Sequence, residues 1–115
     1  MLKSENRLRQ YKDFKEMRTK GKNVYSPLFN LKFIATNEEE SKFAIVVSKK
    51  VSKKAVVRNK IKRQIREIIR LELRDKRIKN NFNVVIYTKR LIAEKEYKEL
   101  EQEIHYILKK ARILN

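Results

Sequence analysis

Five basic residues follow one another at intervals of four along one segment of the chain: Arg58, Lys62, Arg66, Arg70 and Arg74. This spacing puts them on one side of a helix, where like charges at i and i+4 repel by roughly a few tenths of a kcal/mol per pair. An arrangement that costs helix stability needs a compensating partner. Guanidinium and ammonium groups in a row bind phosphates, so the spacing indicates a helix that binds a polyanion.

The charge of the whole chain supports this interpretation. Its 115 residues contain 31 Lys and Arg against 14 Asp and Glu, a net charge of +17. The segment 49–79 holds 14 of the basic residues and three of the acids, a net of +11, so the rest of the chain carries only +6. A run of mixed sign would be a solvated helix face, whereas this nearly uniform sign predicts a phosphate-binding surface.

Residues suited to other chemistry are scarce. The chain has no Cys, which excludes disulfides, thiolate metal sites and cysteine nucleophiles. A protein nuclease needs clustered carboxylates for two metal ions, or a His acting as general acid or base. The one His, His105, has no acidic or Cys partner at ligand spacing in the sequence. We therefore expect no catalytic and no metal-ligating residue in this chain.

The length and composition predict one folded domain spanning residues 1–115. Hydrophobic residues make up 41% of the chain, which is too apolar for a disordered basic tail. No apolar stretch approaches the roughly eighteen residues that span a bilayer, and the first residues lack the apolar core of a signal peptide. We expect a cytoplasmic protein that binds neither a membrane nor a small-molecule substrate.

Hydrophobic periodicity predicts the elements that position the basic residues. A short helix over about 10–20 ends at Gly21, and a half-buried strand follows over 28–36. The apolar run 43–47 is expected to be a central strand, and another strand covers 82–87. Two long helices are predicted over about 54–77 and 93–113. The fold class is α+β, one central sheet packed with helices in the order α-β-β-β-α-β-α.

Each long helix has an apolar stripe that should face the sheet. In the first, the stripe lies opposite the basic side and comprises Val57, Ile61, Ile65, Ile68 and Ile69. In the second, the stripe begins with Ala93 and Tyr97, while the other side carries five Glu. The acidic side makes this second helix a poor phosphate binder.

The basic helix also carries a recognisable motif. Residues 55–67, AVVRNKIKRQIRE, closely resemble the signature of the bacterial ribonuclease P protein component. The similarity extends to Asn6-Arg7-Leu8, Asp13-Phe14, Lys20-Gly21, the strand 29–33 and the run 45–50, in the order of that family. The resemblance therefore covers nearly the whole chain.

The resemblance implies both a topology and a function. The topology is a left-handed crossover from the strand at Phe43 through the basic helix to the strand at Phe82, against the usual right-handed rule. The function is that of the protein subunit of ribonuclease P. By that resemblance the protein would bind the catalytic RNA subunit and the 5′ leader of precursor tRNA, and would assist Mg²⁺-dependent endonucleolytic removal of the leader. The RNA would perform the hydrolysis and hold most of the Mg²⁺.

The same resemblance implies two sets of site residues. A leader-binding cleft between the N-terminal helix and the sheet would use Phe14, Phe29, Asn30 and Lys32. From the residues alone, Phe14 is more often core than a stacking platform, and Lys32 is as often simply solvated. The residues that would bind the RNA subunit are Lys49, Lys50, Lys53, Lys54, Arg58, Asn59, Lys60, Lys62, Arg63 and Arg66.

Two other classes of protein could carry such a basic helix. One is a structural RNA-binding protein of ribosomal type with no role in cleavage. The other is a DNA-binding domain that places the helix in the major groove. The DNA-binding class is the weaker alternative, because the helix is not joined to a second helix by a short turn.

Overall fold

The computed structural model describes residues 2–115. The two long helices are α2 (Ala55–Arg74) and α3 (Tyr97–Lys110), and a shorter helix, α1 (Tyr11–Lys20), precedes the sheet. Two 3-10 helices, η1 and η2, cover Ser4–Asn6 and Arg90–Glu94. The strands are β1 (Lys22–Tyr25), β2 (Phe29–Ala35), β3 (Lys42–Val46) and β4 (Phe82–Thr88). The order of the longer elements confirms the expected α+β fold.

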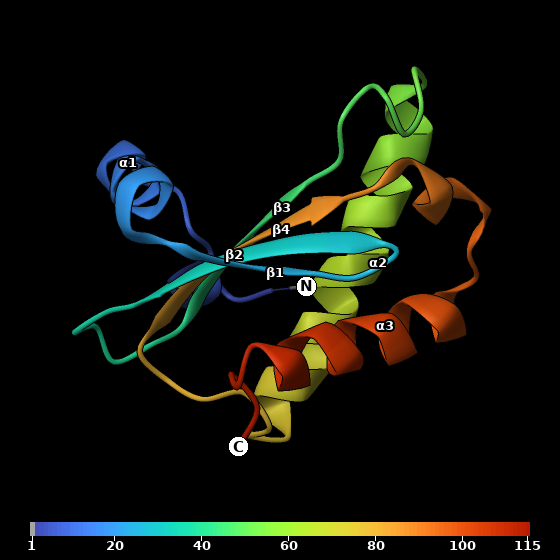
Figure 1. The fold of residues 1–115 in the computed structure, drawn as a ribbon. Helices are drawn as coiled ribbons and strands as arrows, with labels where there is room; N and C mark the ends of the chain where they lie inside the picture. Colours follow the sequence, from blue (N-terminus) through green and yellow to red (C-terminus); the bar gives the residue numbers. More distant parts are fainter. Residues whose placement is uncertain (1) are drawn as a thin grey trace.

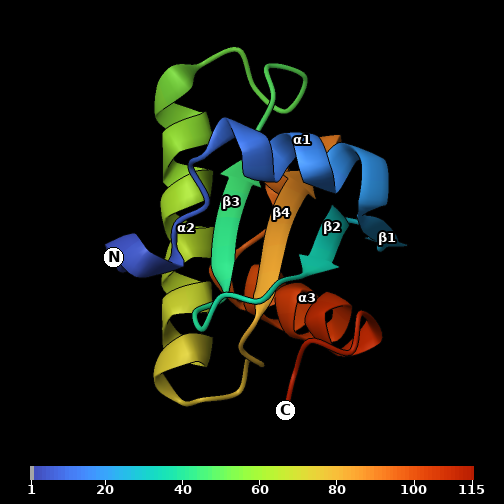
Figure 2. The ribbon, with the colours of Figure 1, turned by 90° about the vertical axis from the view of Figure 1, so that its left-hand side faces the viewer.

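The four strands form one mixed sheet in the order β1-β2-β4-β3. The pairs β1–β2 and β2–β4 are antiparallel, whereas β3–β4 is parallel. Figure 1 places α1 on one side of the sheet and α2 with α3 on the other. In Figure 2, seen from the α1 side, β3 and β4 both point upward, β4 lies to the right of β3, and α2 stands to the left of β3 on the side of the sheet that Figure 1 shows to be away from α1. This crossover is left-handed, as the resemblance implied.

The sheet separates two hydrophobic clusters. Side chains such as Leu31 and Ile86 face α2 and α3 and form the larger cluster. The alternate positions face α1, where Val85 packs with Leu8 and Met17. Because successive strand residues point to opposite faces, this alternation decides which β2 side chains can reach a ligand on the α1 side.

Strand β3 lies at the edge of the sheet, so the prediction of a central position is wrong. The central strands are β2 and β4. The apolar run of β3 is covered on both faces, since Phe43 is buried toward α2 and α3 while Ala44 packs on the α1 side. Its outer edge is partly covered by the N-terminal segment, where the Leu8 N–H donates to the Phe43 carbonyl at 2.9 Å. A continuous apolar run therefore indicates a strand whose two faces are both buried. Such a strand can lie at the edge of the sheet when another segment covers that edge.

The expected helix over 93–113 is interrupted near its start. Residues 90–94 form η2, in which Ile92 is buried and Ala93 is exposed, so Ala93 does not begin the apolar stripe. Helix α3 starts at Tyr97, where Glu99 Oε2 accepts a hydrogen bond from the Glu96 N–H at 3.0 Å. Periodicity did not reveal this break, because Ala93 and Tyr97 are separated by one regular step of four.

Gly21 ends α1, as its position predicts. Its N–H donates to the Met17 carbonyl at 2.8 Å, and the chain then turns directly into β1. A Cβ at this position would collide with that same carbonyl oxygen and would lie 3.2 Å from Lys32 Cγ. The glycine is required here by close approach, because its φ of −68° is ordinary for any residue.

Candidate nucleic-acid interface

Helix α2 has a buried face and a basic face, as its sequence predicts. Ile61, Ile65, Ile68 and Ile69 are buried against the sheet and α3, and Val57 is half-buried beside them. The predicted contacts on the other side are available to a partner, since Asn59, Lys60 and Arg63 are exposed and Arg58, Lys62 and Arg66 are half-buried. The packing of the isoleucines against the core fixes the direction in which the basic side chains point.

The segment between β3 and α2, residues 48–54, is folded by its own hydrogen bonds. The N–H groups of Lys50 and Lys54 donate to the hydroxyls of Ser48 and Ser52, at 3.2 Å in both cases. Val51 is buried and anchors the segment to the core. The remaining side chains point outward, so the structure exposes all four predicted lysines, Lys49, Lys50, Lys53 and Lys54.

Arg58 has a positioning role besides any contact with a partner. Its Nη1 donates to the Ser52 carbonyl at 2.9 Å, which ties the first turn of α2 to the preceding segment. No side chain caps this end of α2, so its first N–H groups and its positive dipole end lie beside the lysines. The geometry suits an anion at this end of the helix.

Arg90 joins this surface although sequence reasoning did not single it out. It begins η2, just beyond the end of β4, and with Lys49, Lys50 and Lys53 it lines a groove of about 740 Å³. Since β4 lies parallel to β3, the C-terminal ends of both strands lie at the same end of the sheet. The available signal was the basic pair Lys89-Arg90, which follows the strand predicted over 82–87 after one intervening residue.

The basic side chains of α2 fall into two groups that differ in their partners. Toward the C-terminal end, Arg70 forms two hydrogen bonds with Glu67, at 2.6 and 3.0 Å, and Arg74 lies 3.1 Å from Asp75. Within residues 2–115, Arg63 and Arg66 form no ion pair with a carboxylate. The charge that a polyanion can use is therefore concentrated on the N-terminal half of α2 and the segment before it.

The pair between Glu67 and Arg70 keeps the carboxylate ionised. Hydrogen bonding by the Arg70 guanidinium, together with its charge, lowers the pKa of Glu67 from 4.5 to about 2, against a smaller opposing effect of desolvation. A carboxyl whose pKa is lower in the folded state contributes stability above its unfolded pKa. That contribution is lost as the pH falls through the folded value, so the window runs from about pH 4.5 down to about pH 2.

Replacing Glu67 by Gln is expected to lower the stability of the protein near neutral pH and to leave it almost unchanged near pH 2. The reason is that only the ionised carboxylate gains from Arg70. Urea unfolding of the wild type and the variant at a series of pH values measures the difference. Glu94→Gln is the control, because Glu94 is exposed and its substitution removes one carboxylate at another place on the surface. A difference that persists unchanged at pH 2 would contradict this assignment.

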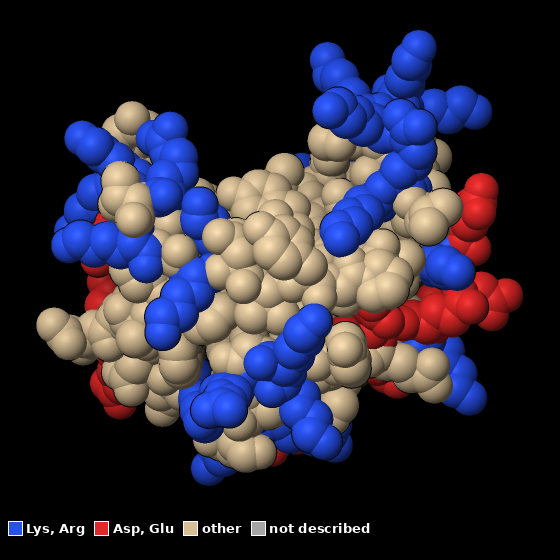
Figure 3. All heavy atoms as spheres, viewed as in Figure 1, with Lys and Arg blue, Asp and Glu red and all other residues tan. Residues whose placement is uncertain are grey.

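A second basic group faces the first across a hollow. Figure 3 shows Lys and Arg gathered over α1 and over the N-terminal end of α2, with uncharged surface between them. The strand register places one row of side chains across this end of the sheet on the α1 side: Tyr25, Asn30, Tyr87 and Val46. Tyr25 and Val46 are exposed and Asn30 and Tyr87 are half-buried. The hollow thus has a floor that combines aromatic, apolar and amide groups.

Three of the four predicted cleft residues lie on the α1 side of the sheet. Phe14 is half-buried on α1 and packs against the smaller cluster with Met17. Asn30 and Lys32 alternate along β2 and both face this side. The Asn30 Oδ1 is buried and has no hydrogen-bond donor within residues 2–115.

Phe29 does not belong to this cleft, and that part of the prediction is wrong. Its side chain is 0% exposed and packs in the larger cluster toward α2 and α3. Adjacent residues of a strand point to opposite faces, so Phe29 and Asn30 could not both line one side of the sheet. The aromatic ring that does sit beside Asn30 on the α1 side is Tyr87, its partner on β4.

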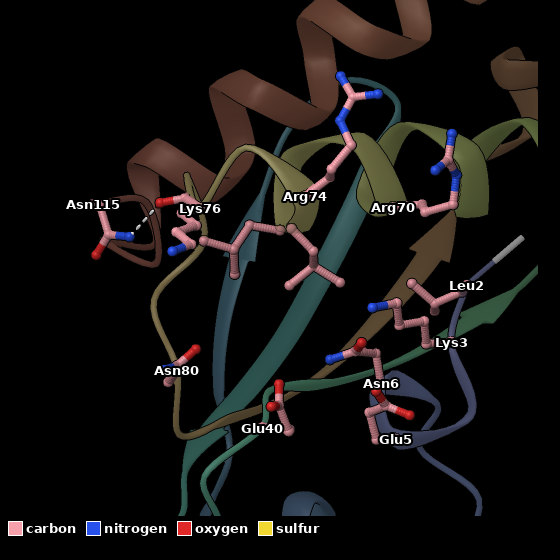
Figure 4. A pocket seen from close by; sticks show the side chains of 12 residues that line it. Leu2, Lys3, Glu5, Asn6, Glu40, Arg70, Arg74, Lys76, Asn80 and Asn115 are labelled. Atoms are coloured by element: carbon pink, nitrogen blue, oxygen red, sulfur yellow. Dashed lines mark hydrogen bonds between the residues drawn. The ribbon is translucent and has the colours of Figure 1, made fainter.

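A cavity of about 680 Å³ lies at the opposite end of α2, between the N-terminal segment and the residues that follow the helix. Figure 4 shows an Arg74 guanidinium and an Arg70 guanidinium at its upper rim, with Lys3, Glu5 and Glu40 below. Its charges are mixed in sign, and Arg70 and Arg74 are engaged by acids. The cavity therefore differs from the uniformly basic surface at the other end of the helix.

His105 has an acidic partner, contrary to the expectation from sequence spacing. Its Nδ1 lies 3.5 Å from Oε1 of Glu72, a carboxylate on α2 that is 5% exposed. Arg77 Nη1 lies 3.7 Å from the other oxygen of the same carboxylate. No group of three or more His, Cys, Asp or Glu residues within 2–115 is placed to hold a metal ion.

Comparison with known proteins identifies the family. The family model named Ribonuclease P matches residues 2–112. The ribonuclease P protein component of a Pseudanabaena strain is 37% identical over 116 residues, covering 100% of this chain and 98% of the relative. That of Clostridium botulinum strain 657 is 37% identical, covering 96% and 98%. The chain belongs to the bacterial ribonuclease P protein family.

Solved ribonuclease P proteins share the fold. The protein from Staphylococcus aureus superposes with a TM-score of 0.82 at 26% identity, covering 96% of this chain and 98% of that one. The protein from Thermotoga maritima gives a TM-score of 0.80 at 29% identity, covering 90% and 96%. The ribonuclease P family assigns this chain the role of a subunit in tRNA processing, with RNA as its partner. Within residues 2–115, no helix has the length and apolar character needed to cross a membrane.

Proposed function

We propose that the chain binds the catalytic RNA subunit of ribonuclease P and the 5′ leader of precursor tRNA, and that the RNA carries out the hydrolysis. The observation that carries this proposal is the separation of charge along α2. The basic residues that no carboxylate engages gather at one end of the helix with four exposed lysines and Arg90. Such a surface binds the phosphates of a folded RNA.

The RNA subunit is assigned to the N-terminal half of α2 and the segment before it. Arg63 and Arg66 would offer planar, multi-donor contacts to phosphate, and the lysines of residues 49–54 would add point charges. The uncapped first turn of α2 adds backbone N–H donors. This placement agrees with the motif that the sequence shares with the family.

The leader is assigned to the hollow between α1 and the N-terminal end of α2. Single-stranded nucleic acid binds where cations line a groove whose floor offers aromatic faces and polar groups. Tyr25 and Tyr87 supply such faces, and the half-buried Asn30 adds a polar group between them. Phe14 and Lys32 extend the floor toward α1.

The Mg²⁺ needed for cleavage is assigned to the RNA. The charged side chains that gather at the proposed interface are Lys and Arg, which carry no oxygen ligand and repel a hard cation. The protein's residues therefore do not fit Mg²⁺ there, and the cations instead reduce the repulsion between RNA phosphates. The proposal also places the protein in the cytoplasm with its RNA partners.

Reconstitution tests this function directly. Purified protein alone is expected to show no specific cleavage of precursor tRNA. When the protein is added to the ribonuclease P RNA of the same genome, cleavage should need less Mg²⁺ and less salt. The reason is that the cations of the protein compensate phosphate charge. The measurement is the rate of leader release across a Mg²⁺ titration, with and without protein. If the protein leaves that titration unchanged, the proposed function fails.

A further inference from the structure

A groove of about 680 Å³ runs along the flank of α2 that faces the start of α3. Its apolar wall is made by Val56, in the first turn of α2, and by Tyr97, the first residue of α3. Lys60, Arg63 and Gln64 line it from successive turns of α2. The groove is distinct from the hollow beside α1, because α1 lies on the other side of the sheet.

The apolar wall is unusual in its surroundings. Val56 is an apolar side chain that is 80% exposed, and its neighbours along this flank of α2 are basic or amide side chains. Tyr97 is half-buried, with part of its surface packed on the core and the rest in the groove. Isolated exposed apolar residues need no explanation, but here a valine and a tyrosine face one depression inside a phosphate-binding surface.

We propose that this groove binds one unpaired base of the ribonuclease P RNA, stacked against Tyr97 and Val56. The cations at the rim favour binding of a polyanion. The apolar wall favours entry of a base into the groove over entry of a phosphate. A paired helix presents mainly phosphates and 2′-hydroxyls, whereas an unpaired nucleotide also offers a flat base that stacks on aromatic and apolar side chains. Lys60 and Arg63 are placed to hold the flanking phosphates, and the Gln64 amide carries both a donor and an acceptor for a base edge.

The acid in the groove does not oppose this occupant. Glu67 lines one end, where its carboxylate is bridged by Arg70 through hydrogen bonds of 2.6 and 3.0 Å. Arg66 also lines the groove, so the surroundings of that carboxylate are not net acidic.

The inference rests on the proposed function and is tested by separating stacking from charge. Val56→Ser and Tyr97→Leu should each weaken binding of the ribonuclease P RNA at least about fivefold, since loss of one base stack has an effect of that order. Neither change removes a phosphate contact, so the slope of log affinity against log salt should stay the same. Tyr97→Phe keeps the ring and should bind nearly as the wild type does.

Two comparisons keep the outcomes distinct. Tyr106→Leu removes an exposed tyrosine from the same helix outside the groove and should leave affinity unchanged. Arg63→Ala should reduce the salt slope. If Arg63→Ala changes the slope but Val56→Ser and Tyr97→Leu bind normally, the base site is wrong and the proposed function stands. If none of these variants alters binding, the proposed function fails as well. Should Tyr97→Leu unfold, Val56→Ser decides alone, because its side chain lies at the surface.

Discussion

Replacing Arg63 and Arg66 together by Ala is expected to weaken binding of the ribonuclease P RNA about 100-fold at low salt. Each guanidinium that meets phosphate contributes about 1.5–3 kcal/mol, and a tenfold change in affinity corresponds to about 1.4 kcal/mol. Neither side chain forms an ion pair with an acid within residues 2–115, so its charge is available to a partner. The fold should be unaffected, because Arg63 is exposed and Arg66 is half-buried.

The salt dependence of binding checks this result independently of affinity. Each lost phosphate contact lowers the slope of log affinity against log salt by about 0.7 to 0.9. Arg74→Ala is the matched control, since Arg74 lies on the same side of α2 but is engaged by Asp75 at 3.1 Å. Equal losses for Arg74→Ala and for Arg63→Ala would show that position along α2 does not matter. The assignment of the RNA subunit to the N-terminal half would then be wrong.

Replacing Phe29 by Ala is expected to destabilise the protein by about 3–5 kcal/mol, which is a large part of the stability of a small domain. Its ring is 0% exposed and packs between the sheet and the helices α2 and α3, so truncation leaves a cavity in the larger cluster. Equilibrium unfolding in urea measures the effect. A contribution to leader binding is not expected, because the ring is on the far side of the sheet from the hollow.

Phe14→Ala is the informative partner for this experiment. Phe14 is half-buried on the α1 side, so its truncation should cost less stability than that of Phe29. It should also weaken binding of precursor tRNA with a leader more than binding of mature tRNA by the assembled ribonucleoprotein. If Phe29→Ala were as stable as the wild type and lost leader binding instead, the burial of Phe29 would not describe the protein in solution.

The helices were predictable to the extent that their packing is local. In α2, Ile61, Ile65 and Ile68 recur at helical spacing and all three are buried, so periodicity located the core face and hence the basic face. The start of α3 was not predictable in this way. Its first turn is fixed by the bond between Glu96 and Glu99, and the buried Ile92 precedes it in a separate 3-10 helix.

Contacts between distant segments were the part that sequence patterns could not supply. The apolar run of β3 indicated burial, but its edge position depends on β4 inserting beside β2 and on Leu8 reaching Phe43. Arg90 reaches the basic surface only because β4 runs parallel to β3. Glu72 and His105 lie on different helices, and no spacing within the chain relates them.

The left-handed crossover came from the family motif and not from a physical rule. Periodicity gives the order of a strand, a helix and a strand, and the general preference would have given the opposite hand. The leader-cleft prediction was wrong for Phe29 because it overlooked the alternation of side chains along a strand. Phe29 and Asn30 are adjacent in β2, so only one of them could face α1.

The place of β4 in the sheet also limits how early the protein can fold during synthesis. This strand pairs with β2 on one side and β3 on the other, yet it is the last of the four strands to leave the ribosome. Until Thr88 has emerged, β2 and β3 lack a shared neighbour, and the isoleucines of α2 lack the part of the core that β4 and α3 supply. The basic segment is thus complete in the growing chain before the sheet is. Non-local pairing of this kind is slow to form, which makes the order of synthesis a constraint on how this small domain matures.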